Sequence, residues 1–73
     1  MSEPSIYFNQ VDGELTVTVT ADSVAELKGC VNKVNRRMKN SLYKRIIRWS
    51  DMETISGGLL MRHAVFRLRG DSQ

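Results

Sequence analysis

Apolar residues in the middle of the chain recur at helical spacing. Between residues 21 and 40 they are separated by three or four positions, which aligns them along one side of a helix. Asp22 or Ser23 can cap the start of this helix, and Glu26 follows as an early acid. The segment is therefore predicted to be an amphipathic helix. Its apolar stripe consists of Val24, Leu27, Val31, Val34 and Met38.

The chain before this helix alternates between apolar and polar residues over two runs, 6–11 and 14–20. Asp12 and Gly13 separate the runs, and Asp-Gly is a strong hairpin signal because both turn positions need positive φ. A two-residue loop fixes the register and collects the apolar side chains on one face. The expected pairs are Val11 with Glu14, Phe8 with Val17, and Ile6 with Val19.

Two interpretations are open for the chain after the helix. The spacing of Leu42, Ile46 and Trp49 is compatible with a continuation of the helical stripe. The alternative is a second hairpin, with strands over 43–55 and 59–69.

The expected strand register favours a second hairpin over a continuation of the helix. A turn at Gly57 and Gly58 would place Glu53 opposite Arg62, which is a favourable cross-strand charge pair. A slip of one residue would scramble the apolar face, so we expect this pairing. The predicted apolar face consists of Ile47, Trp49, Ile55, Leu60, Ala64, Phe66 and Leu68.

The order of these elements predicts an α+β fold of the ββαββ type. We expect a four-stranded antiparallel sheet with the one amphipathic helix packed on one face. With 73 residues, the chain is expected to form a single small domain over residues 1–73. Residues 1–5 and 70–73 are expected to be flexible tails.

Charge is strongly segregated along the chain, although the net charge is only +3. Residues 1–27 contain five acids and no Lys or Arg, whereas residues 28–48 contain eight Lys or Arg and no acid. Such asymmetry is typical of nucleic-acid-binding surfaces. A solvated helix face is the simpler explanation of the same pattern.

The second face of the predicted hairpin suggests a partner for the basic residues. Its register sets Arg48 opposite Arg67 and Ile46 opposite Arg69, and facing like charges favour an anion such as phosphate. Tyr7, Tyr43 and His63 are the candidate stacking groups. The sequence thus predicts a small basic domain that binds DNA or RNA. The candidate contacts are Arg48, Arg67, Arg69, Lys44, Lys28, Arg36 and Lys39.

A homodimeric protein-interaction module that modulates a partner protein is the alternative. The same hairpin face carries apolar residues among its arginines, and exposed apolar patches with charged rims mark interaction sites. Edge strands of antiparallel hairpins can also pair with another chain. The interface candidates are Ile46, Met52, Met61 and Val65.

A metal-independent ribonuclease is a remote third hypothesis, with His63 as acid or base and Arg48 or Arg67 at the phosphate. The sequence lacks a known catalytic motif, so we expect binding rather than catalysis. One His and one Cys cannot build a structural zinc site, and we expect neither metal nor cofactor. The lone thiol, Cys30, and the lack of a long apolar run or signal-like N-terminus predict a cytoplasmic protein without a membrane span.

Overall fold

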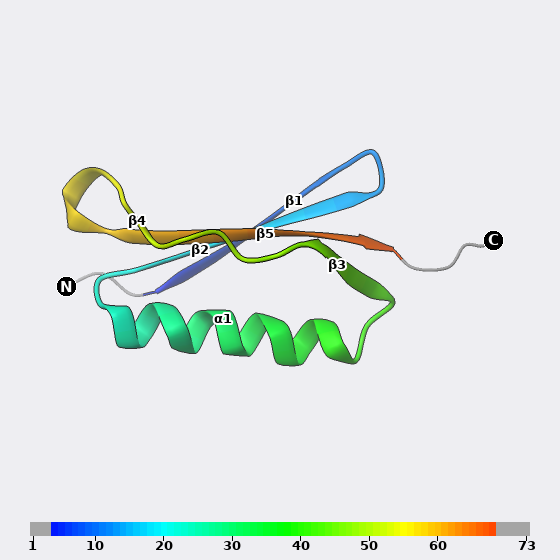
Figure 1. Cartoon of the computed structure of the whole chain (residues 1–73), viewed down its shortest axis with the longest axis horizontal. Coiled ribbons are helices and arrows are strands. Elements are labelled where there is room, and N and C mark those ends of the chain that lie inside the picture. The colour runs from blue at the N-terminus through cyan, green and yellow to red at the C-terminus, as the bar shows by residue number, and fades with distance from the viewer. Residues whose placement is uncertain (1–3, 69–73) are drawn as a thin grey trace.

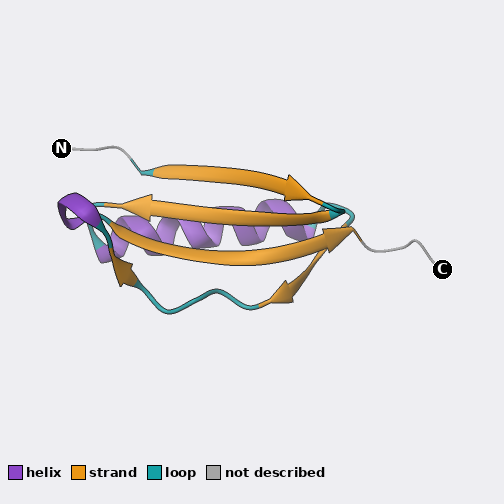
Figure 2. Ribbon diagram, turned by 90° about the horizontal axis from the view of Figure 1, so that it is seen from above, coloured by secondary structure: helices purple, strands orange, loops and turns teal. Residues whose placement is uncertain are grey.

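The computed structural model of the protein describes residues 4–68. Helix α1 packs across one face of an antiparallel sheet and leaves the other face uncovered (Figures 1 and 2). The strand order is β1-β2-β5-β3, and the two-residue strand β4 also pairs with β5. The predicted α+β class, antiparallel sheet and single helix are confirmed. The elements are β1 (Ser5–Val11), β2 (Glu14–Ala21), α1 (Val24–Lys39), β3 (Tyr43–Ile47), β4 (Glu53–Thr54), the 3₁₀ turn η1 (Ser56–Gly58) and β5 (Leu60–Leu68).

The first hairpin has the register that the sequence predicts. Asp12 and Gly13 have φ angles of 52° and 80°, as the tight turn requires. Val11 lies opposite Glu14, and the pairing continues in register along both strands to Ser5 and Thr20. Ser5 therefore belongs to β1, although residues 1–5 were expected to form a tail. Residues 1–3 and 70–73 of the expected tails lie outside the described residues.

Helix α1 begins after Ser23, whose hydroxyl accepts a hydrogen bond from the Glu26 backbone N–H at 3.2 Å. The predicted stripe is buried except for Val24, which is 58% exposed. Val24 is the first helical residue, where the chain has just left the sheet. Cys30, which was not part of the predicted stripe, is buried as well. The core cluster contains Leu15, Val17, Val19, Ala21, Leu27, Cys30, Val31, Val34, Met38, Trp49, Ala64 and Phe66.

The chain after α1 forms strand β3, so the helical continuation through Trp49 is excluded. The predicted register of the second hairpin is wrong near its turn. The turn contains three residues, and the Ile55 N–H donates to the Leu59 carbonyl at 2.7 Å. The extra turn residue shifts the pairing by one position, so Glu53 lies opposite Met61 and not opposite Arg62.

The register shifts further along the hairpin, because three extra residues are accommodated between β3 and β4. Arg45 pairs with Phe66 and Glu53 pairs with Met61. Glu53 is eight positions after Arg45, whereas Met61 is only five positions before Phe66. A bulge lies between Arg45 and Ile47, and an irregular stretch follows it.

These shifts overturn the predicted pairing of the arginines. Lys44 lies opposite Arg67, in the place expected for Arg48. The predicted apolar face is also wrong for Ile47 and Leu68, which are 53% and 45% exposed. The expected pair of Ile46 with Arg69 lies partly outside the described residues. Trp49 and Phe66 still meet in the core, with ring centroids 6.5 Å apart at 74°.

Candidate nucleic-acid interface

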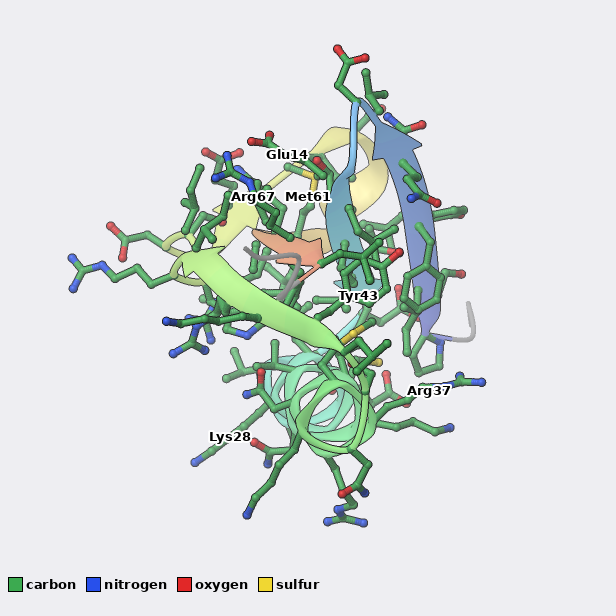
Figure 3. All side chains as sticks on the ribbon, turned by 90° about the vertical axis from the view of Figure 1, so that its right-hand side faces the viewer. Glu14, Lys28, Arg37, Tyr43, Met61 and Arg67 are labelled. Carbon is green, nitrogen blue, oxygen red and sulfur yellow. The ribbon has the colours of Figure 1, made fainter. Side chains whose placement is uncertain are left out.

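Arg67 lies on the uncovered face of the sheet and is partly neutralised there. Its Nη2 is 2.5 Å from Oε2 of Glu14, the residue opposite it on β2, and Figure 3 shows the two side chains together above the sheet. Both side chains are largely exposed, at 59% and 42%, so the pair adds at most about 1 kcal/mol to stability. Arg67 therefore contributes less free positive charge than the sequence predicts.

Arg48 lies in a different environment, at the β3 edge of the molecule. It lines an open hollow together with Arg45, Trp49, Asp51 and Arg62. The register places Arg45 and Arg62 on the helix-facing side of their strands, opposite the core residues Phe66 and Val19. Arg48 thus shares one hollow with Arg45 and Arg62, although Arg62 was expected to pair with Glu53.

A second hollow adjoins the first and connects it to the helix. Arg45 lines both hollows, and Lys39, Tyr43 and Lys44 also line the second. Figure 3 shows Lys28 on the flank of α1 nearest β3, so the basic residues continue along this flank of the helix. We call this region the α1–β3 basic surface. It consists of Lys28, Lys39, Lys44, Arg45, Arg48 and Arg62.

Hydrogen bonds hold the irregular segment that carries Arg48. The indole Nε1 of buried Trp49 donates to Oδ1 of Asn35 on α1 at 2.9 Å. Nε of Arg62 donates to the Ser50 carbonyl at 2.8 Å. The backbones of Ser50 and His63 are also linked, by an N–H···O=C bond of 2.8 Å. The segment is therefore fixed between helix and sheet although it is not a regular strand.

The α1–β3 basic surface has little compensating negative charge. Within residues 4–68, the structure gives no carboxylate partner to Lys39, Lys44, Arg45 or Arg48. Asp51 lines the hollow that contains Arg48, and the residues that line the hollow beside the helix include no acid. Unpaired guanidinium and ammonium groups at a concave surface attract anions and focus the field there.

The structure brings together part of the predicted set of contacts. Lys28, Lys39 and Arg48 belong to the α1–β3 basic surface. Lys44 forms its border, because it lines the second hollow but is paired with Arg67 across the strands. Arg67 does not belong to this surface, and Arg69 lies outside the described residues. Arg36 is exposed. Because successive helical residues are rotated by about 100°, its side chain points farther from the sheet than those of Lys28 and Lys39.

Sequence reasoning missed Arg45, Arg62 and Asn35. Arg45 was counted in the basic segment but not among the candidate contacts, and Arg62 was explained as the partner of Glu53. The signal available in the sequence was the basic character of β3, whose residues 44 and 45 are Lys and Arg on opposite sides of an edge strand.

The predicted interface residues are spread over two regions. Met61 and Val65 are half-buried on the uncovered sheet face, where Thr20 and Thr16 lie opposite them. Ile46 occupies the β3 bulge and is 40% exposed, and Met52 precedes β4 and is 47% exposed. They do not form one compact patch with Arg48.

No protein-family model matches the chain, and neither a curated protein nor a solved structure matches it. Among residues 4–68, no three His, Cys, Asp or Glu side chains gather as a metal site. In that same part of the chain, α1 is too short and too polar to cross a membrane. Function must therefore be inferred from the geometry and charge of the surface.

Proposed function

We propose that the protein binds nucleic acid through the α1–β3 basic surface. The observation that supports this most strongly is the gathering of Lys39, Lys44, Arg45 and Arg48 around two adjoining hollows without a carboxylate partner in residues 4–68. Guanidinium groups bind phosphate oxygens in a bidentate manner, and a polyanion can contact several of them at once.

Tyr43 supplies an aromatic group within this surface. It is half-buried in the hollow that Lys39 and Arg45 also line. Proteins that hold single strands combine a basic groove with aromatic rings on which bases stack. Trp49 does not serve this role in the proposal, because it is buried and its Nε1 is bonded to Asn35.

The proposal assigns binding rather than catalysis to the protein. His63 lies opposite Thr18 on the uncovered sheet face, and its backbone is bonded to Ser50. Of the two arginines proposed to assist His63, Arg48 lies with the α1–β3 basic surface and Arg67 is paired with Glu14. The lone cysteine, Cys30, remains the basis for proposing a cytoplasmic location.

Fluorescence anisotropy with labelled mixed-sequence oligonucleotides tests the proposal. Single-stranded DNA, single-stranded RNA and duplex DNA would each be titrated at about 50 and about 200 mM salt, where phosphate contacts are strongly salt-dependent. We expect binding that weakens as salt rises. Replacing Arg45 and Arg48 by Gln should reduce the slope of log K against log salt by about 1.4 for a single strand if both contact phosphate.

The matched control removes the same charge from the other flank of the helix. Lys33 and Arg37 line hollows beside β1, and Figure 3 shows Arg37 on that side of α1, away from Lys28. Their replacement by Gln should leave most of the affinity intact. Equal losses in the two double variants would reject the α1–β3 basic surface, and no binding at low salt would reject nucleic-acid binding altogether.

A homodimeric module that binds a partner protein is the alternative proposal. It is supported by the sheet face that the helix leaves uncovered, where Met61 and Val65 are half-buried and Val65 lies opposite the exposed Ile47. Uncovered apolar side chains with charged neighbours suit protein contacts. A strictly monomeric protein in sedimentation velocity at micromolar concentration would count against the dimer.

A further inference from the structure

The two edges of the sheet differ in how they are protected against pairing with another strand. The β3 edge is basic and bulged, and both features discourage pairing. The β1 edge runs over seven residues, Ser5–Val11, without a charge, a proline or a bulge. Figure 2 shows β1 as the outer strand on its side of the sheet. An unprotected edge of this length is a template for a further strand.

The first hairpin determines which backbone groups this edge offers. A two-residue loop closes on a hydrogen-bonded pair, here Val11 with Glu14, and hydrogen-bonded pairs then alternate with non-hydrogen-bonded pairs. The N–H and C=O groups of Ile6, Phe8 and Gln10 therefore point away from β2. These three residues are symmetric about Phe8, which is the middle residue of β1.

We propose that β1 pairs with β1 of a second copy of this chain, antiparallel and with the two-fold axis at Phe8. Phe8 then faces the partner's Phe8, and Ile6 and Gln10 exchange hydrogen bonds with the partner's Gln10 and Ile6. Every outward group in this set finds a complement, because the edge is complementary to itself under the two-fold rotation. The two sheets become continuous, with both helices on the same face.

Apolar exposure along β1 agrees with this pairing. Tyr7, Phe8 and Val11 are 59%, 46% and 56% exposed. Phe8 and Ile6 also line a hollow against Val34 of the helix. The pairing would place side chains of the partner strand beside those on both faces of β1 and set the partner's Phe8 at this hollow.

The charges beside the edge give the dimer a recognisable salt dependence. Lys33 and Arg37 line the same hollow as Phe8. The two-fold rotation brings them toward their counterparts in the second copy, and salt screens this repulsion. Dimerisation should therefore strengthen as salt rises, whereas nucleic-acid binding should weaken. The inference does not depend on nucleic-acid binding, and these opposite trends separate the two.

Amide hydrogen exchange measured by NMR at several concentrations of the whole chain tests the pairing directly. The amides of Ile6, Phe8 and Gln10 should exchange rapidly in dilute protein and become protected as concentration rises. Those of Tyr7 and Asn9, which are bonded to β2, should be protected throughout. A protein that stays monomeric to millimolar concentration, or a dimer in which the first three amides remain unprotected, would overturn the proposal.

Two substitutions in β1 and one control extend the test by sedimentation equilibrium. Phe8→Lys places like charges opposite each other at the axis and should weaken the dimer by about tenfold or more. Ile47→Lys adds the same charge at a similarly exposed apolar site on β3 and should leave the dimer unchanged.

Gln10→Pro removes a backbone N–H that points away from β2 and makes no hydrogen bond to it in the monomer. This variant tests the same pairing if Phe8→Lys fails to fold. Equal dimerisation of the folded β1 variants and Ile47→Lys would refute the proposed edge.

Discussion

Removing the indole of Trp49 should destabilise the protein more than any change on the surrounding basic surface. Trp49 is 8% exposed, packs edge-to-face against Phe66, and donates its Nε1–H to Asn35 at 2.9 Å. Trp49→Phe keeps an aromatic ring but loses that hydrogen bond and part of the buried surface. We expect a loss of about 1–2.5 kcal/mol, of which the bond accounts for about 1 kcal/mol.

Trp49→Ala should cost about 3–5 kcal/mol, because it also leaves a cavity. A chain of 73 residues is expected to have a total stability of roughly 4–11 kcal/mol, so this loss is a large fraction of it. Urea denaturation followed by circular dichroism measures both losses. Tryptophan fluorescence cannot follow the variants, because Trp49 is the only tryptophan of the chain.

A double-mutant cycle separates the hydrogen bond from the packing. Trp49→Phe, Asn35→Ala and the double variant should show a coupling free energy of about 0.5–1.5 kcal/mol. Arg48→Ala is the neighbouring control and should change stability by less than about 0.5 kcal/mol, because Arg48 is exposed. A neutral Trp49→Phe, or an absence of coupling, would refute the anchoring role assigned to the indole.

Three further changes test other parts of the fold. Leu27→Ala should cost about 2–5 kcal/mol in urea denaturation, because Leu27 is only 2% exposed in the core. Ser23→Ala should cost about 0.5–2 kcal/mol by thermal melting, because it removes the cap from the Glu26 N–H, whereas Ser23→Gly should cost only a few tenths. Glu14→Gln should change stability by less than about 1 kcal/mol, and less still at high salt, because its pair with Arg67 is exposed.

The first hairpin and the helix could be predicted because several independent signals agree there. Asp12 and Gly13 determine the turn, and the alternation of Ile6, Phe8, Val17 and Val19 selects the same register. Local turn chemistry and the apolar pattern thus specify one structure. The helix is similarly defined by its capping residue and its 3.6-residue period.

The second hairpin was predicted only in outline, because its sequence does not distinguish between registers. Gly57 and Gly58 suit both the expected two-residue loop and the observed three-residue turn, since both have positive φ. The three extra residues before β4 cannot be found from alternation, because Trp49 can reach the core from a bulged segment as well as from a regular strand. The arginine pairing depended on that register, so it was wrong.

Perturbation of backbone amide NMR signals by an oligonucleotide tests the central claim most directly. Titration of the isotope-labelled protein with a short mixed-sequence single strand should shift the signals of Lys39, Tyr43, Arg45 and Arg48, and leave those of the uncovered face around Thr18 in place. Shifts centred on the uncovered face, or no shifts at low salt, would contradict the assignment of the α1–β3 basic surface.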